Sequence, residues 1–301
     1  MTQQFGGRWT EDKLAQLRKY LHAYMVLMTK NPRAAYFRKV YFDAFAGSGV
    51  RTERATPAES TDLLLVDHDP ETVEFLKGSA QVALETEPAF DRYIFVEKNP
   101  EYAANLQLLR ESFPQLSDRI VIAPGDGNDL LVRWCSKTDW KKTRAVVFLD
   151  PYGMQVDWST IEAIAATKGI DLWILFPLGQ GVNRLLTRQG RPPAAWADRL
   201  TRFFGTDEWR SRFYRESEVT DLFGDTFSLV EKDADFDVIG AYFLARLRTV
   251  FARVADRPLP LRNLKGTPIF LLCFAAGNEK GAPTAVKIAN DIIDAWGRKK
   301  K

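Results

Sequence analysis

The sequence predicts an α/β fold in which a mostly parallel sheet carries helices on both faces. Five short apolar runs alternate with stretches of helical periodicity, and an acidic or glycine-containing turn follows four of the runs. Continuous apolar runs are typical of parallel strands, because helices cover both faces of such strands. The predicted strands are Tyr41–Phe45, Tyr93–Val96, Ile120–Ala123, Ala145–Leu149 and Leu172–Phe176.

The two ends of the chain complete this pattern. Leucine and methionine recur every three or four residues between positions 14 and 28, which predicts an amphipathic helix that ends at Asn31-Pro32. Leu259–Leu264 and Pro268–Ala276 predict a hairpin that adds a terminal antiparallel strand. The other helices that we expect are Pro100–Leu109, Asp129–Trp134, Trp158–Thr167, Val238–Val254 and Gly281–Trp296.

We expect a single domain over residues 1–301, with an N-terminal helical region over 1–32 and two insertions. Residues 51–77 are polar and irregular. Residues 184–237 interrupt the alternation of strands and helices with a segment rich in arginine and aromatic residues, which predicts a helical insertion.

The composition argues against several classes of protein. Two cysteines, Cys135 and Cys273, and two histidines, His22 and His68, lack the spacing of metal ligands, which argues against a zinc or iron–sulfur enzyme. The longest apolar run, Ile269–Ala276, is too short to cross a bilayer, and the first residues lack the apolar core of a signal peptide. We therefore expect a cytoplasmic protein.

The turns after the predicted strands are the strongest functional signal. In an open parallel sheet, ligands bind beyond the carboxyl ends of the strands, so these turns should meet at one cleft. Gly47 and Gly49 let the backbone turn tightly after Phe45 and approach the amino-acid end of S-adenosylmethionine (SAM). Asp43 is close enough in sequence to accept a hydrogen bond from the ammonium group of that ligand.

The next two turns suit the rest of the same cofactor. Glu97 ends the second strand, where a carboxylate can accept hydrogen bonds from both ribose hydroxyls. Asp126 can accept from the adenine amino group, with Asn128 nearby to hold the loop. A helix cap or a turn is the alternative interpretation of Asp126-Gly127-Asn128. The series as a whole predicts a SAM-binding cleft.

A dinucleotide-binding domain is the main competing interpretation. Its fingerprint requires a third glycine three residues after Gly49, where this sequence has Thr52. It also places an acidic residue about 20 positions after the glycines, whereas Glu97 comes 48 positions after Gly49. Both differences favour SAM over NAD or FAD.

Asp150-Pro151-Tyr152-Gly153 follows the fourth strand, where the transferred methyl group would project. It is similar to the Asp/Asn-Pro-Pro-Tyr/Phe motif of enzymes that methylate exocyclic amines of nucleobases or a glutamine amide. The Asp150 carboxylate and the Pro151 carbonyl can accept the two hydrogens of a planar amino group, and Tyr152 can stack on the base. The second proline of that motif is missing here, and Tyr152-Gly153 occupies its place. A tight turn before the helix at Trp158 is the alternative.

The predicted insertion contains eight arginines between Arg184 and Arg215, interleaved with six aromatic residues. Arginine with aromatics suits phosphate contact and base stacking, which is typical of a nucleic-acid surface. A helical subdomain with its aromatics inside and its arginines in solvent explains the same pattern, and the spacing of Leu200, Phe203 and Phe204 favours it.

Several blocks of sequence are similar to those of the three-Cys-motif partner proteins, the TcmP family. They cover much of the chain, and they are Tyr41–Gly47, Phe148–Met154, Leu175–Gly179, Phe204–Trp209, Phe274–Asn278 and Lys280–Pro283. The resemblance implies a Rossmann-like, class I methyltransferase fold and a three-Cys-motif partner, which looks like a radical-SAM-type iron–sulfur protein. It does not name a substrate.

The sequence therefore predicts a SAM-dependent methyltransferase that acts on an exocyclic amine of a nucleic-acid base or a comparable macromolecule. A non-catalytic scaffold that keeps the SAM fold to dock the three-Cys-motif protein is the alternative.

Overall fold

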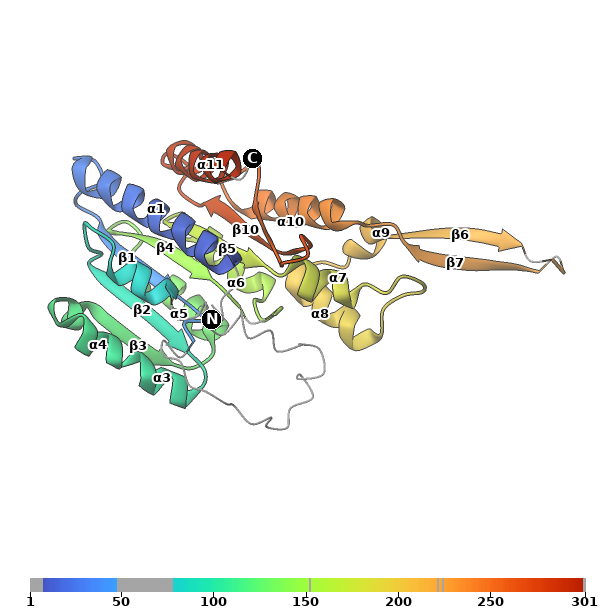
Figure 1. Ribbon diagram of the computed structural model, residues 1–301, viewed down its shortest axis with the longest axis horizontal. Helices are drawn as coiled ribbons and strands as arrows, with labels where there is room; N and C mark the ends of the chain where they lie inside the picture. Colours follow the sequence, from blue (N-terminus) through green and yellow to red (C-terminus); the bar gives the residue numbers. More distant parts are fainter. Residues whose placement is uncertain (1–7, 48–77, 152, 221, 224, 300–301) are drawn as a thin grey trace, which may run out of the picture.

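The computed structural model of the chain describes residues 8–47, 78–151, 153–220, 222–223 and 225–299. A central sheet carries helices on both faces, and a long two-stranded ribbon projects away from it (Figure 1). The expected irregular insertion, 51–77, lies outside the described residues. Within them, each helix is too short or too polar to cross a membrane.

The main sheet has the strand order β3-β2-β1-β4-β5-β10-β8, and its first five strands pair in parallel. The order reverses between β1 and β4, which makes this position the switch point where doubly wound folds bind ligands. The five strands are β1 (Arg38–Asp43), β2 (Arg92–Glu97), β3 (Ile120–Pro124), β4 (Thr143–Leu149) and β5 (Ile170–Phe176).

The far end of the sheet is antiparallel, as the terminal hairpin predicts. β10 (Pro268–Ala276) pairs antiparallel with β5, with β9 (Leu259–Arg262) and with β8 (Arg253–Val254). A mostly parallel sheet with one antiparallel strand next to β5 is the Rossmann-like methyltransferase sheet that the sequence predicts. The short strand β8 is a difference, because its residues were expected in the preceding helix, which ends at Val250.

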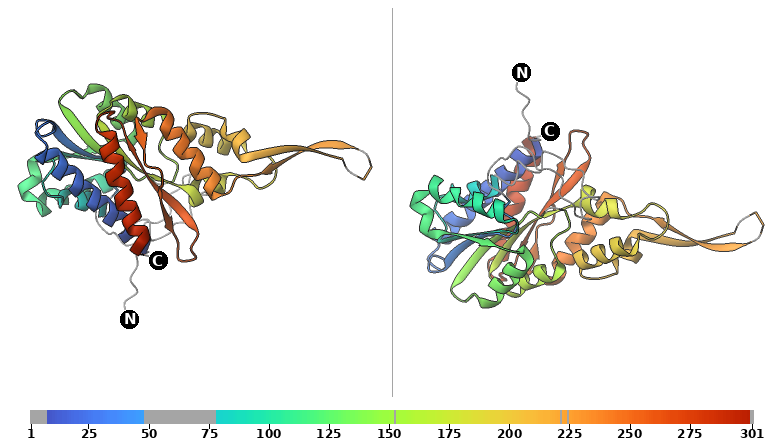
Figure 2. Two further views of the ribbon diagram at one scale, coloured as in Figure 1. Left: turned by 90° about the horizontal axis from the view of Figure 1, so that it is seen from above. Right: turned by 90° about the horizontal axis from the view of Figure 1, so that it is seen from below.

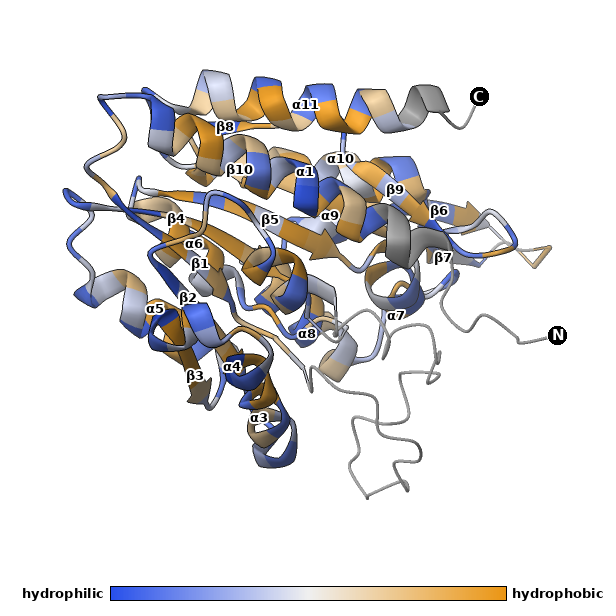
Figure 3. Cartoon of the chain, turned by 60° about the vertical axis from the view of Figure 1, so that its left-hand side comes forward, coloured by the Kyte–Doolittle hydropathy of each residue, from blue (hydrophilic) through white to orange (hydrophobic). Residues whose placement is uncertain are grey.

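Alternate side chains of the strands point to opposite faces and build two separate cores. In β1, Val40 and Phe42 enter one core while Tyr41 enters the other. The strands are accordingly apolar along their length, whereas the covering helices turn polar surfaces outward (Figure 3). The first core is covered by α5 (Gly127–Lys137), α6 (Trp158–Ala166), α8 (Ala194–Phe204) and α10 (Phe236–Val250), and the second by α1 (Arg8–Lys30), the helix 78–84 and α11 (Ala282–Lys299).

Helix α1 lies beside α11 on one face of the sheet (Figure 2). Its buried side includes Leu17, Tyr20 and Leu21, each at most 1% exposed. The Tyr20 hydroxyl donates a hydrogen bond of 2.8 Å to Oδ2 of Asp171 in β5. This bond and the apolar contacts fix the N-terminal helix across the sheet.

The helical segments differ from the prediction in small ways. The helix expected over Pro100–Leu109 is two helices with a break at Gln107, which ends the first and precedes the second. The remaining helical elements are α3 (Pro100–Leu106), α4 (Leu108–Ser112), the 3-10 helix Pro114–Arg119, the π-helical turn Leu178–Val182, α7 (Asn183–Leu185) and α9 (Trp209–Phe213).

The insertion 184–237 is helical only in its first part, so the prediction of a helical insertion is wrong for its second part. After α9 the chain forms an antiparallel ribbon of β6 (Tyr214–Thr220) and β7 (Thr226–Lys232). The aromatic residues that suggested helices end at Tyr214. The following strand has many exposed polar side chains, held by cross-strand contacts such as Ser228 Oγ to Glu216 Oε1 at 2.7 Å.

The first core contains a stack of aromatic rings that joins the insertion to the sheet. Phe243 of α10 stacks on Phe176 with ring centroids 4.2 Å apart and on Phe203 at 5.8 Å, and it is fully buried. We expect Phe243→Ala to lower the free energy of unfolding by about 3–5 kcal/mol, because it leaves a cavity among these rings. Chemical denaturation measures the change. Val238→Ala, at a partly exposed position of the same helix, should change stability by less than about 0.5 kcal/mol.

Candidate functional site

The parallel register brings the predicted acidic residues to one edge of the sheet. Asp43, the last residue of β1, lies opposite Phe95 of β2 and Phe148 of β4. Glu97 ends β2 and Asp150 directly follows β4. Asp43 and Asp150 therefore flank the switch point between β1 and β4.

Asp43 is fully buried, and both of its oxygens are bonded within the chain. Oδ1 accepts from the Phe45 amide at 3.2 Å, and Oδ2 accepts from the Ser79 hydroxyl at 2.9 Å. Burial raises the pKa of Asp43 to about 7, against the hydrogen bond from Ser79, and the charges of Asp150 and Glu97 add to the rise. The side chain thus shapes the turn after β1, where Gly47 has a φ of 63°.

This turn packs directly against the start of α5. A Cβ at Gly127 would collide with the Ala44 carbonyl oxygen and lie 3.0 Å from Cε1 of Phe45. Glycine is therefore required here by the close approach of two loops. As a result, the half-buried Phe45 ring lies at the boundary between the β1 turn and the turn that carries Asp126.

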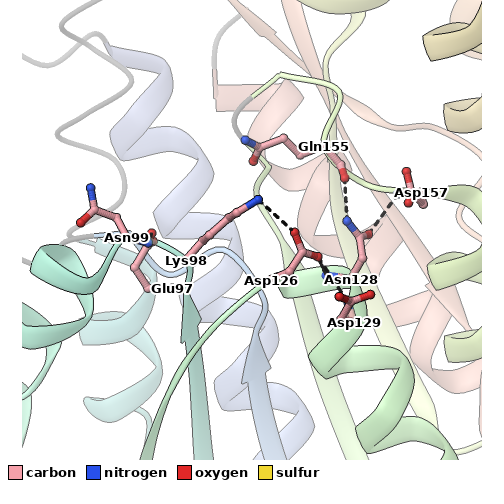
Figure 4. Close-up of polar contacts among 8 residues, drawn as sticks. All are labelled: Glu97, Lys98, Asn99, Asp126, Asn128, Asp129, Gln155 and Asp157. Carbon is pink, nitrogen blue, oxygen red and sulfur yellow. Dashed lines mark hydrogen bonds and ion pairs between the residues drawn. The ribbon is translucent and has the colours of Figure 1, made fainter. Parts of the chain in front are cut away.

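Glu97 and Asp126 each use one carboxylate oxygen to fix a neighbouring loop (Figure 4). Glu97 Oε1 accepts from the Asn99 amide at 2.7 Å. Asp126 caps α5, because its Oδ1 accepts from the amides of Asn128 at 3.0 Å and Asp129 at 3.4 Å. The cap interpretation of Asp126 is thus confirmed, and its Oδ2 lies 3.6 Å from Nζ of the exposed Lys98.

The sequence predicts that Asn128 holds the loop of Asp126, but its side chain instead holds the loop that follows β4. Its Nδ2 donates to the Gln155 carbonyl at 2.8 Å, and its Oδ1 accepts from the Asp157 amide at 3.1 Å and the Thr160 hydroxyl at 2.8 Å. Figure 4 shows the side chain pointing from α5 towards this loop. All three hydrogen bonds of this side-chain amide are made within the protein. Asn128, which the sequence places among the cofactor-binding residues, would therefore act on the cofactor only indirectly, by holding the loop.

A buried lysine that the sequence analysis did not identify completes the cluster. Nζ of Lys13 in α1 lies 3.3 and 3.5 Å from the two carboxylate oxygens of Asp150. Lys13 is fully buried and Asp150 is 6% exposed. Burial lowers the pKa of Lys13 to about 7, against the attraction of Asp150 and Asp43. Burial also raises the pKa of Asp150, and Lys13 opposes that rise.

Helical spacing contains a signal for Lys13. It lies four residues before Leu17 and seven before Tyr20, on the buried face of α1. Because a lysine is rarely buried without a partner of opposite charge, the sequence pattern could have predicted that Lys13 pairs with an acidic residue.

The motif after β4 is described in part. Pro151 is buried, and Gly153 has a φ of 68° with open space around it. Tyr152 and Gly49 lie outside the described residues. The site therefore consists of Asp43, Glu97, Asp126 and Asp150, together with Lys13.

The described residues contain no group of three or more acidic, cysteine or histidine side chains arranged to hold a metal ion. Both cysteines are free and buried, and burial raises the pKa of each thiol, to about 12 for Cys135. The thiols are therefore protonated near neutrality, which makes them poor nucleophiles. The ionisable groups of the site are therefore its carboxylates and the ammonium of Lys13.

The buried Asp43 makes stability depend on pH. Because its pKa is raised in the folded state, the folded chain keeps a proton that the unfolded chain releases between pH 4 and 7. We expect the free energy of unfolding to fall over this range, and Asp43→Asn to reduce that fall by an amount on the order of a few kcal/mol. Denaturant titrations at pH 4.5 and 7.5 measure both slopes. Asp129→Asn, at an exposed position, should keep the wild-type dependence of the free energy of unfolding on pH. If Asp43→Asn also kept the wild-type dependence, Asp43 would not be the group that causes it.

No protein-family model matches the sequence, and no curated protein matches it. Among solved structures, the chain is similar to a Legionella pneumophila protein of the family DUF519, with 13% identity, a TM-score of 0.49 and coverage of 96% of this chain and 93% of the other. A Bacillus cereus O-methyltransferase solved in complex with SAH has 12% identity, a TM-score of 0.34 and coverage of 74% and 90%.

A putative rRNA methylase from Clostridium thermocellum has 14% identity, a TM-score of 0.29 and coverage of 71% and 94%. Likenesses at this level carry no argument about the activity of this chain, which must be argued from its own residues.

Proposed function

We propose that this chain is a SAM-dependent methyltransferase that modifies an exocyclic amine on a nucleic-acid base or a comparable macromolecule. The observation that carries the proposal is the position of Asp43, Glu97 and Asp150 at the carboxyl edge of three adjacent parallel strands, with Asp126 beyond the fourth. Acidic side chains beside the switch point suit a ligand that presents hydroxyls and amines.

The second oxygens of Glu97 and Asp126 support this choice of cofactor. Loop contacts fix one oxygen of each carboxylate, and this leaves Glu97 Oε2 for ribose hydroxyls and Asp126 Oδ2 for an adenine amino group. Lys98 is 80% exposed and contacts Asp126 Oδ2 only at 3.6 Å, so a ligand can displace it easily. When bound, SAM would supply an electrophilic methyl group on its sulfonium sulfur.

Asp150 and Pro151 would orient the acceptor amine. A carboxylate offers about four lone-pair sites, so Asp150 can contact Lys13 and still accept from an amine hydrogen. The Lys13 ammonium favours the charged form of Asp150, which is the form that accepts. Tyr152 would stack on the acceptor, as its place in the motif predicts.

The helical part of the insertion suggests a polyanionic substrate. It follows β5 at the carboxyl edge of the sheet, and Arg184, Arg188, Arg202 and Arg212 are exposed on it. Arginines at this position can contact phosphates beside the cleft. A three-Cys-motif protein is the proposed partner, and this part of the proposal rests on the sequence resemblance.

A docking scaffold without activity is a second candidate. The buried contact between Lys13 and Asp150 favours it, because Lys13 gives the Asp150 carboxylate a partner within the chain, so that no ligand is needed to explain its burial. Cofactor binding and methyl transfer separate the two candidates.

We expect wild-type protein to bind SAM with micromolar affinity, and Glu97→Ala to weaken binding at least tenfold because the ribose hydroxyls lose their acceptor. Isothermal titration calorimetry measures both. Glu111→Ala removes an exposed carboxylate from α4, away from the edge of the sheet, and should bind as the wild type does. Absence of heat with wild-type protein would favour the scaffold.

We expect transfer of labelled methyl groups from SAM to total RNA, to DNA or to a protein fraction, with a loss of at least about a hundredfold in Asp150→Ala. Because that change leaves Lys13 buried without its partner, the double variant Lys13→Met/Asp150→Ala serves as a second test. Both should keep the SAM affinity of the wild type. Undiminished transfer in both variants would exclude Asp150 from the reaction, and no labelling by wild type, with or without the partner, would exclude the enzyme.

A further inference from the structure

One side chain connects two parts of the cleft that the proposed function assigns to different ligands. Asn128 lies in the first turn of α5, two residues after Asp126, and its side chain reaches the loop between β4 and α6. The loop begins at Asp150, beside the proposed acceptor, and ends where α6 starts at Trp158. Among the described residues, no other side chain of α5 both donates a hydrogen bond to this loop and accepts one from it.

Asn128 binds the start of α6, a helix that has no side-chain cap of its own. Asp157 occupies the N-cap position of α6, yet its side chain makes no capping hydrogen bond. Instead, Asn128 Oδ1 accepts from the Asp157 amide and the Thr160 hydroxyl, so both lone pairs of this oxygen bind the start of α6. Nδ2 holds the Gln155 carbonyl two residues earlier. Three hydrogen bonds from one planar amide leave the end of the loop little freedom to rotate.

The connection to the cofactor side runs through the backbone. Asp126 Oδ1 accepts from the Asn128 amide at 3.0 Å, so the orientation of the carboxylate and the position of Asn128 depend on each other. A ligand that holds Asp126 Oδ2 would therefore also hold the first turn of α5. Gly127, which is enclosed by Ala44 and Phe45, prevents that turn from moving towards β1.

The other end of the loop is less constrained. Gly153 has a positive φ, and among the described residues no atom lies within 4 Å of the position that a Cβ would take. A glycine adopts this positive φ without the steric cost that other residues incur. The loop thus has a fixed end at Asn128 and a permissive point near the acceptor motif.

We propose that Asn128 is a positioning residue that couples occupation of the Asp126 side of the cleft to the conformation of the loop after Asp150. The inference rests on the proposed function, since it assumes an adenine group at Asp126 and an acceptor amine at Asp150. Binding of the cofactor fixes the loop, which raises the affinity for the acceptor, and by linkage the acceptor raises the affinity for the cofactor by the same factor.

Hydrogen exchange of backbone amides tests this coupling directly, because the Asp157 amide is itself a donor to Asn128. In wild type, SAM should slow exchange over residues 153–160 at least fivefold. In Asn128→Ala, exchange of this segment without ligand should be at least tenfold faster, and SAM should protect only residues 126–129. Asn128→Asp keeps the acceptor for Asp157 and Thr160 and should retain most of the protection at Asp157.

Kinetics give the second measurement. With SAM bound, Asn128→Ala should raise the KM for the acceptor about tenfold or more, because the cofactor no longer fixes the loop. The Kd for SAM alone should stay within threefold of wild type, whereas the loss of a direct ligand contact would change it. Asn278→Ala is the matched control, because the Asn278 side chain also donates to a carbonyl, that of Lys168, and accepts from an amide, that of Gly281, and neither contact involves the loop or the acidic residues of the site. If Asn128→Ala fails to fold, Thr160→Val removes one of the three bonds and should give an intermediate effect.

The outcomes separate this inference from the proposed function. Equal protection of residues 153–160 by SAM in wild type and Asn128→Ala would overturn the coupling and leave the methyltransferase proposal intact. Absence of SAM binding to wild type would overturn the proposed function and, with it, the coupling. If, without ligand, the amides of residues 153–160 exchange at the same rate in Asn128→Ala as in wild type, only the role of Asn128 is overturned.

Discussion

A buried ammonium beside two buried carboxylates is the constraint on which the site depends. Asp43 and Asp150 lie in a region where burial raises the pKa of both, and Lys13 is the cation at 3.3 Å from Asp150. Removing one partner of such a group leaves an uncompensated charge and commonly costs about 3–5 kcal/mol. With pKa values of about 7 for both Lys13 and Asp43, the cluster can change its protonation near neutrality. The charge that this cluster presents to a ligand therefore depends on where Lys13 lies.

That position requires the N-terminal helix to stay on the sheet. Farther along α1, Tyr20 bonds Asp171 of β5, and the Tyr24 ring stacks on Phe90 with centroids 6.0 Å apart. Neither contact is near the cleft, but each holds the helix that carries Lys13. The chemistry of the β4 edge thus depends on packing between the first residues of the fold and strands that come much later in the sequence.

The order of strands and helices and the acidic ends of the strands could be predicted from periodicity, because a buried parallel strand must be apolar and its ligands must lie at its carboxyl end. Helical spacing could mark Lys13 as a buried lysine that needs an acidic partner, but it could not identify that partner, because Asp150 comes 137 residues later in the sequence. The role of Asn128 also depends on a non-local contact, with Gln155 and Asp157. The ribbon was missed because its strands bury few side chains and show no apolar period, as the exposed Glu216 and Glu218 illustrate.

The ribbon changes how the charge of the insertion should be understood. Residues 183–213 contain seven arginines and three acidic residues, whereas residues 214–233 contain six acidic residues and two basic ones. The structure separates these two groups in space, because the ribbon projects away from the helices and the sheet (Figures 1 and 2). A polyanion would be attracted to the helices beside the cleft and repelled along the ribbon. Within the insertion, the part that adjoins β5 is therefore the one whose charge suits the polyanionic substrate that we propose.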